Sequence, residues 1–306
     1  MKRKVNQVGT GTLTISLPVN WVKDNNIRKG DELDLLVKGK ELRLGSASKT
    51  DFMSTQISLT SNNSRYIFQI IRNLYLIGFD EIKINYKDNK ILSTIQEVSN
   101  KLIGFEIVEQ KKNNCTIKNL STGIETQIDP LLRRIFLLNK SLFETTIDQI
   151  TNKEFEINNI LNLRDNIKKL LNLYRRIITK KKVFSPIKNR SIYIILIRIS
   201  MICDNIVYSH KYLTKNKDIN NFEILLKYIK EVSQMYNFYY TIFYSKKLEQ
   251  VDELNNLREK LVFKDFIKIC QTKQTPKEII PALHYYAEIA RLIATNAGAM
   301  ISFHST

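Results

Sequence analysis

Histidine and cysteine, the residue types most common at catalytic and metal centres, are few in this sequence and lie far apart. No two histidines share a helix at metal-ligand spacing, and the cysteines have no metal-ligand spacing either. These residues are His210, His284, His304, Cys115, Cys203 and Cys270. We find neither a G-x-S-x-G segment nor a Cys/His nucleophile arrangement. The sequence therefore predicts a protein that is not an enzyme and that carries no cofactor.

A glycine-rich segment near the N-terminus does not have the pattern of a phosphate-binding loop. Gly9-Thr10-Gly11-Thr12 lacks the terminal Lys-Ser/Thr pair, and it opens a strand pattern where such a loop would open a helix. The segment is better interpreted as a turn between two strands.

The chain is strongly basic, with a net charge of +18 from 48 Lys and Arg against 30 Asp and Glu. Such an excess favours a polyanionic partner, either nucleic acid or a membrane surface. A genome with biased composition would also supply the many Lys, Ile and Asn residues, so charge alone leaves both interpretations open. The basic start Lys2-Arg3-Lys4 is likewise open to interpretation as a solvated terminus.

Length and hydropathy indicate an ordinary intracellular protein of two or three domains. The 306 residues are 43% hydrophobic and 25% charged. Apolar runs such as Ile192 to Ile197 stop at charges well before about 18 residues, so we expect no membrane insertion. The start from Met1 to Val5 has no signal-peptide core, and no disulfide framework is indicated, so we expect a cytoplasmic location.

Alternating apolar residues predict a small β-rich domain over residues 1–47. Strands around Val5 to Val8 and Leu13 to Leu17 flank the first turn, and Pro18 opens a short helix from Val19 to Asn26. A second hairpin pairs Leu33, Leu35 and Val37 with Leu42 and Leu44 through Lys38-Gly39-Lys40. The stretch from Gly45 to Thr50 has the composition of a linker.

The remaining chain divides into an α/β module over residues 52–128 and a helical domain over residues 129–306, which makes the fold class α+β. The module has a βαβαββ pattern: strand Gln56 to Leu59, helix Ser64 to Ile77, strand Glu81 to Tyr86, helix Ile91 to Leu102, and strands Phe105 to Val108 and Cys115 to Ile117. Gly78 and Gly104 are expected to end its two helices.

Six helices are expected in the third zone, packed as antiparallel bundles. The first begins at an Asp129-Pro130 cap, the second runs from Ile157 to the cluster Thr179 to Lys182, the third from Ser185-Pro186 to Leu213, the fourth from Ile219 to Tyr244, the fifth from Val251 to Cys270, and the sixth from a capping box at Thr275 to Glu278 as far as Phe303. Similar segments around Arg198 and Arg291 suggest two three-helix repeats.

The N-terminal zone closely resembles the AbrB/SpoVT swapped-hairpin family. The resemblance rests on a basic strand, a Gly turn, the strand Thr12 to Pro18, a short helix with Asn20-Trp-Val, and Ile27-Arg-Lys-Gly-Asp31, and it covers nearly all of residues 3 to 45. About 45 residues cannot bury a core alone. The resemblance implies that two copies interleave their hairpins into one β-barrel, which makes the chain a homodimer.

DNA-binding members of that family face the phosphates with basic residues of the first strand and the short helix. The resemblance therefore implies a DNA interface made of Lys2, Arg3, Lys4, Thr10, Thr12 and Lys23. Thr10 and Thr12 stand where some members carry arginine, and their hydroxyls can still bond phosphates or bases.

The helical zone resembles the PhoU family, in which each of two three-helix repeats carries an acidic E-x-x-x-D metal motif. The matching stretches here are Ser200 to Asp204 and Arg291 to Thr295, so only Asp204 of the four acidic ligands is present. Glu288 lies out of register. One carboxylate cannot hold a metal cluster, so we expect no metal, and we interpret Asp204 as a helix residue satisfied by a neighbour.

The order of the two resemblances along the chain is similar to that of archaeal regulators of phosphate uptake. The sequence therefore predicts a dimeric transcription regulator of phosphate homeostasis that binds double-stranded DNA. The first alternative is a PhoU-like adaptor that binds a phosphate-transport or signalling protein, with the hairpin domain serving only to dimerise. The second is an antitoxin-like partner of another protein.

Overall fold

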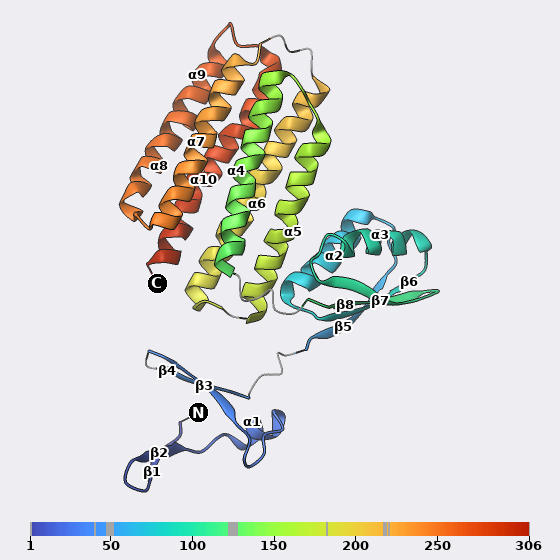
Figure 1. Ribbon diagram of the computed structural model, residues 1–306, viewed down its shortest axis with the longest axis vertical. Coiled ribbons are helices and arrows are strands. Elements are labelled where there is room, and N and C mark those ends of the chain that lie inside the picture. The colour runs from blue at the N-terminus through green and yellow to red at the C-terminus, as the bar shows by residue number, and fades with distance from the viewer. Residues whose placement is uncertain are drawn as a thin grey trace. The chain divides into compact units, whose positions relative to one another are not determined.

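The computed structural model divides into two compact units, Met1–Met53 and Ser54–Thr306 (Figure 1). It describes residues 2–39, 41–46, 52–121, 128–181, 183–216, 219 and 221–305. Five sequence interpretations fall partly outside these ranges. The parts outside are Lys40 in the second turn, residues 47–50 of the linker, residues 122–127 of the α/β module, Lys182 in the basic cluster that ends the second helix, and residue 220 in the fourth helix.

The N-terminal unit consists of two hairpins and one short helix. Its elements are β1 (Val5–Val8), β2 (Thr12–Ile15), α1 (Val19–Asp24), β3 (Leu33–Lys38) and β4 (Glu41–Ser46). β1 pairs antiparallel with β2, and β3 pairs antiparallel with β4, as separate two-stranded sheets (Figure 1). Both expected hairpins are confirmed, but the described residues of one chain do not form a closed barrel.

Local interactions explain where the turns of this unit fall. Gly9 adopts a φ of 69°, which a residue with a Cβ rarely tolerates, and thus lets the chain reverse between β1 and β2. The backbone N–H of Arg28 donates to the Asp31 carboxylate at 2.6 Å, which closes the second turn. Helix α1 ends at Asp24 and not at Asn26 as expected, because Asn26 is left-handed at a φ of 53°.

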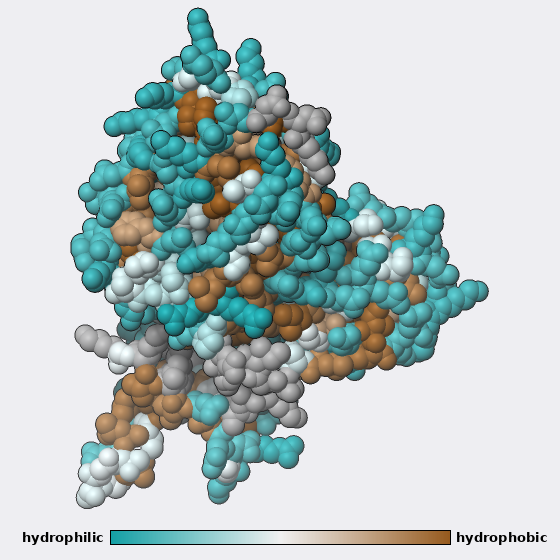
Figure 2. Space-filling view, turned by 45° about the horizontal axis from the view of Figure 1, so that its top comes forward, coloured by the Kyte–Doolittle hydropathy of each residue, from teal (hydrophilic) through white to brown (hydrophobic). Residues whose placement is uncertain are grey.

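Several apolar side chains of the N-terminal unit are exposed to solvent. Leu13 is 70% exposed, Val37 71% and Leu35 58%, and no residue of α1 is buried. Figure 2 shows apolar surface on this unit. The described residues of the unit therefore form no buried hydrophobic core within a single chain, although the sequence supplies the side chains for one.

The second unit begins with a two-layer α/β module. Its elements are β5 (Ser54–Leu59), α2 (Ser64–Ile77), β6 (Glu81–Tyr86), α3 (Asn89–Ser99), β7 (Phe105–Lys111) and β8 (Asn114–Asn119), with strand order β5-β6-β8-β7. β5 and β6 are parallel, as a βαβ crossover requires, and the other pairs are antiparallel. The expected βαβαββ order is confirmed, although helix α3 ends at Ser99, three residues before Leu102.

Capping residues place the ends of α2 where the sequence predicts them. The Asn63 side chain accepts a hydrogen bond from the backbone N–H of Tyr66 at 3.1 Å, which caps the N-terminus. Gly78 is left-handed at a φ of 113° and donates to Leu74 O and Tyr75 O, which closes the C-terminus. The core side chains of α2, including Ile67 and Ile71, are fully buried against the sheet.

The rest of the chain is helical, with stretches at all six expected places. They are α4 (Ile128–Asn152), α5 (Ile157–Lys181), α6 (Pro186–Lys215), α7 (Glu223–Ser245), the continuous run α8 (Val251–Arg258), η3 (Glu259–Asp265) and α9 (Phe266–Gln271), and α10 (Ile280–His304). Figure 1 shows them side by side as a bundle, with α6 and α10 in close contact. Both helices supply the bundle core with residues such as Ile199 and Ile293.

Helix α6 is the one described helix that is long and apolar enough to cross a membrane, whereas the sequence led us to expect none. Its apolar runs are interrupted by so few charges that 18 consecutive residues are still apolar enough to span a bilayer. Half of this stretch is buried inside the bundle. The core helix of a bundle can have the same apolar composition as a membrane-spanning helix.

Two of the expected helix caps are wrong. Asp129 lies in the first turn of α4, which is described from Ile128, so Asp129 is not the residue before the helix. The Thr275 hydroxyl is buried and caps no backbone N–H among the described residues. A single 3₁₀ turn, η4 (Lys277–Ile279), comes first, and α10 begins only at Ile280, which leaves Thr275 too far from the helix to form a capping box.

A buried arginine joins the α/β module to the bundle. Arg176 of α5 is 4% exposed. Its guanidinium donates to Tyr75 O at 2.7 Å, to Phe79 O at 2.8 Å and to Asp80 Oδ1 at 2.9 Å. Lys180 also bonds Asp80. Arg176 thus neutralises a buried carboxylate and donates to two backbone carbonyls at the end of α2 and just beyond it.

We expect Arg176→Leu to lower the free energy of unfolding by about 3 to 5 kcal/mol, because it removes a cation from the buried Asp80 carboxylate and the guanidinium donors from two backbone carbonyls. Urea unfolding followed by circular dichroism measures this change. Arg134→Leu on the exposed side of α4 is the matched control and should cost less than about 0.5 kcal/mol. Equal effects of the two substitutions would contradict the role of Arg176.

His210 is fully buried in the bundle, and neither ring nitrogen has a hydrogen-bond partner among the described residues. Burial lowers the pKa of His210 from 6.5 to about 4, because the charged imidazolium loses its hydration. The unfolded chain binds this proton at a higher pH than the folded chain does. Stability is therefore intact above pH 6.5 and falls as the pH drops towards 4.

We expect the unfolding free energy to fall by about 2 to 3 kcal/mol between pH 7 and pH 4.5 on account of this one residue. His210→Leu should remove that part of the pH dependence, whereas His284→Leu, at an exposed position, should keep it. Urea unfolding at the two pH values checks both variants. A pH dependence that His210→Leu leaves unchanged would show that the pKa of His210 is the same in the folded and the unfolded chain.

Candidate nucleic-acid interface and basic cleft

The six residues implicated in DNA binding by the sequence all lie exposed on the N-terminal unit. Three precede β1, Thr10 lies in the turn, Thr12 begins β2, and Lys23 lies in the last turn of α1. The three before β1 are Lys2, Arg3 and Lys4. All six are therefore accessible to a large ligand.

The register of the first hairpin places most of its apolar side chains on one face. Val5 pairs with Ile15 and Gln7 with Leu13, so Val5, Leu13 and Ile15 share a face, because directly opposed residues point the same way. Asn6 pairs with Thr14 and Val8 with Thr12 on the other face. Thr12 thus lies on the mostly polar face of the hairpin.

The second hairpin gathers most of its apolar residues on one face. Leu35 pairs with Leu44 and Val37 with Leu42, and Leu33 lies on the same side. The opposite face carries Asp34 and Glu41 among its members. One face of this hairpin is therefore suited to contact protein, and the other to contact water.

A second candidate site lies within the other unit, in a cleft of about 450 Å³ between the α/β module and the bundle. We call it the basic cleft. Side chains at helical spacing on α2, α5 and α6 line it, together with one lysine that follows α3. The lining residues are Arg65, Phe68, Gln69, Arg72, Lys101, Arg164, Asp165, Lys168, Lys169, Asn172, Ser200 and Asp204.

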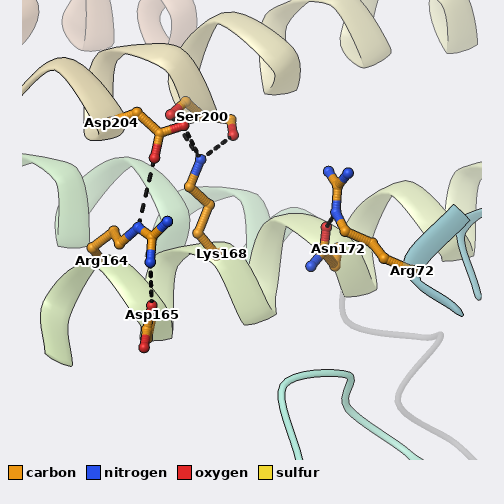
Figure 3. Close-up of polar contacts among 7 residues, drawn as sticks. All are labelled: Arg72, Arg164, Asp165, Lys168, Asn172, Ser200 and Asp204. Atoms are coloured by element: carbon orange, nitrogen blue, oxygen red, sulfur yellow. Dashed lines mark hydrogen bonds and ion pairs between the residues drawn. The ribbon is translucent and has the colours of Figure 1, made fainter. Parts of the chain in front are cut away.

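Cations surround the only acidic residue that matches the PhoU motif. The Lys168 ammonium donates to Asp204 Oδ2 at 2.5 Å and to Ser200 Oγ at 2.6 Å, and Arg164 Nε lies 3.6 Å from Asp204 Oδ1 (Figure 3). Burial lowers the pKa of Lys168, and the charge of Asp204 opposes this shift. Asp204 is thus satisfied by neighbouring side chains, as its interpretation from the sequence supposed.

Arg72 lies at the other end of the basic cleft, where its charge is less well compensated. Its Nε donates to Asn172 Oδ1 at 3.0 Å, a neutral acceptor (Figure 3). The pKa of Arg72 is lowered from its usual value, first by burial and second by the positive charge of Arg175. No carboxylate among the described residues forms a salt bridge with Arg65, Arg72, Lys101 or Lys169.

The sequence did not predict the basic cleft, although part of the signal was present. Arg65 and Arg72 recur two helical turns apart on α2, and Lys168 and Asn172 recur one turn apart on α5. Nothing in either pattern indicates that these two helices meet, because they are about 100 residues apart in the chain. The cleft is a consequence of tertiary packing.

The donors around Asp204 do not suit a metal ion. Within the described part of the chain, no three of the His, Cys, Asp and Glu side chains gather where they could hold one. Arg291, at the matching place in the other half, forms a salt bridge with Glu288 at 2.9 Å. A divalent cation at Asp204 would have to displace the Lys168 ammonium while repelled by Arg164.

Comparison of the chain with models of protein families, with curated proteins and with solved structures finds no match. The resemblances to the AbrB/SpoVT and PhoU families therefore rest on the sequence pattern alone.

We expect protein purified without chelators to contain far less than one iron or zinc ion per chain, because Lys168 neutralises the single carboxylate at this position. Elemental analysis by mass spectrometry measures the metal content. Asp204→Ala serves as the comparison, since a genuine site would lose its metal in this variant. Near-stoichiometric metal that disappears with Asp204→Ala would contradict the expectation.

Proposed function

We propose that the chain is a homodimeric, DNA-binding transcription regulator, whose N-terminal units form one swapped-hairpin barrel and whose second unit is the sensor. One observation carries this proposal. The N-terminal unit combines exposed apolar strand faces with an exposed basic segment. Within the described part of a single chain, these apolar faces do not pack against other apolar residues.

A second copy of the chain is the partner that best fits the apolar faces. Each fully buried Leu or Val side chain contributes about 1.5 to 3 kcal/mol. The second hairpin alone offers Leu33, Leu35, Val37, Leu42 and Leu44 on one side. Identical hairpins with the same pattern bury these faces against each other in an isologous interface, as a two-fold dimer requires.

The basic segment is suited to the phosphates of duplex DNA. A dimer doubles the cations at Lys2, Arg3, Lys4 and Lys23, and this brings them towards the number typical of DNA-binding proteins. Thr10 and Thr12 add hydroxyl groups that can bond phosphates. Because the polar face of the first hairpin is opposite its apolar face, dimerisation leaves the DNA-facing groups accessible.

The process that the resemblance implies is phosphate homeostasis, with the helical bundle as the sensing or docking part. The main alternative is a PhoU-like adaptor that binds a transporter or signalling protein, and an antitoxin-like partner of another protein is a further one. Both alternatives retain the dimer and lack affinity for DNA. DNA binding therefore separates them from the regulator.

We expect the full chain to be a dimer in solution and Leu35→Lys to shift it towards monomer, because the new ammonium would lie within the apolar interface. Light scattering after gel filtration measures the mass. Asp34→Lys is the matched control, since the neighbouring position lies on the opposite face, and it should leave the dimer intact. A monomeric wild-type chain, or dissociation by both substitutions equally, would contradict the proposed interface.

We expect duplex binding with a steep salt dependence, which Arg3→Ala combined with Lys4→Ala should reduce. Each phosphate contact contributes about 0.9 to the slope of log affinity against log salt. The double change removes two cations from each of two chains, so the slope should fall by up to about 3.6. Fluorescence anisotropy with a labelled duplex at several salt concentrations measures it.

Lys211→Ala combined with Lys264→Ala is the control for this experiment, because it removes the same charge from exposed positions of the bundle. It should leave the slope nearly unchanged. Absence of duplex binding by the wild-type protein would favour the adaptor, and equal slopes for the two double variants would place the DNA interface elsewhere.

A further inference from the structure

The basic cleft has an excess of positive charge that the chain itself does not neutralise. Six cationic side chains line it against two carboxylates, which leaves an excess of four positive charges. Both carboxylates are already in salt bridges, Asp165 with Arg164 at 2.9 Å and Asp204 with Lys168 at 2.5 Å. The cations with no such partner in the described chain are Arg65, Arg72, Lys101 and Lys169.

The chain compensates the positive charge of the basic cleft poorly, which indicates that the cleft binds an anion. Arg72 is partly buried, its one side-chain hydrogen bond goes to a neutral amide, and Arg175 lies close enough to repel it. Holding a desolvated cation next to another cation costs free energy. A bound anion would offset that cost, because guanidinium groups bind phosphate oxygens with strong, paired hydrogen bonds.

Shape restricts the ligand to a small molecule. A cleft of about 450 Å³ between packed elements lies in the size range of small-molecule sites, which are commonly found between domains. A duplex is too wide to enter a cavity of that size. The charge excess of four also exceeds what a single phosphate group, with about −1.5 to −2, would balance.

We propose that the basic cleft binds a small molecule carrying two or more phosphate groups, held between α2 and α5. Arg72, Arg65, Lys101 and Lys169 bind the phosphate oxygens, while Arg164 and Lys168 remain paired with Asp165 and Asp204. The ligand bridges the α/β module and the bundle and strengthens their contact. This site lies in the second unit, and it does not depend on DNA binding by the first.

Isothermal titration of the full chain with sodium tripolyphosphate and with ATP tests the proposal, at low salt and matched ionic strength. We expect one site per chain. Equal affinities would identify the phosphate chain as the whole determinant, and tighter binding of ATP would add contacts to the nucleoside. No binding of either compound at about millimolar concentration would overturn the proposal.

Substitutions in the cleft should act in opposite directions. Arg72→Gln should weaken binding about ten-fold or more, since a charge-assisted hydrogen bond contributes about 1.5 to 3 kcal/mol. Asp204→Asn should strengthen binding about five-fold, because it removes a repelling charge and releases Lys168. If Asp204→Asn fails to fold, Asp165→Asn provides the same test. If the two carboxylates had only a structural role, neither substitution would increase the affinity.

A pair of double variants separates this site from general attraction to a basic protein. Arg65→Ala with Lys101→Ala, at exposed lining positions, should weaken tripolyphosphate binding strongly. Lys87→Ala with Lys90→Ala removes the same charge from the same module outside the cleft and should have little effect. Equal losses would overturn the proposal. So would a cleft variant that loses affinity for duplex DNA and keeps its affinity for tripolyphosphate.

Discussion

The guanidinium of Arg176 reaches from the bundle into the end of the α/β module, beside the rings of Tyr75 and Phe105. A lone buried cation would cost several kcal/mol. Here it donates to Asp80 and to the carbonyls of Tyr75 and Phe79 at the end of α2. This interaction fixes α2 against α5. The basic cleft exists because these two helices are held together while their basic residues line the same gap.

Among the described residues, the two units differ in which apolar side chains they bury and which charged side chains they leave unpaired. The second unit has two internal clusters of buried hydrophobic residues, and its cleft gathers an excess of positive charge. The N-terminal unit differs, because its apolar strand faces are exposed to solvent in a single chain. We therefore propose a second copy of the chain as the partner of the first unit and a small anion as the ligand of the second.

The sequence predicts the parts of this fold that depend on short patterns, such as helix caps and alternating apolar residues. The bounds of α2 and β6 match expectation, because Asn63 and Gly78 mark the helix ends and Ile82 and Ile84 alternate with polar residues. The Thr275 capping box fails because η4 intervenes. A π-helical segment, η3, also interrupts the fifth helix, where Tyr228 donates to Leu261 O at 2.8 Å. Contacts such as Arg176 with Asp80 join residues that no short pattern relates, so the cleft was not predicted.

Hydrogen exchange of backbone amides in the full chain, with and without a duplex, tests the proposed regulator most directly, because it reports which segment the DNA covers. We predict slower exchange over residues 2–15 and 19–24 when the duplex is present, with little change across α7 and α10. Protection confined to the second unit, or no protection anywhere at low salt, would contradict DNA binding through the N-terminal hairpins.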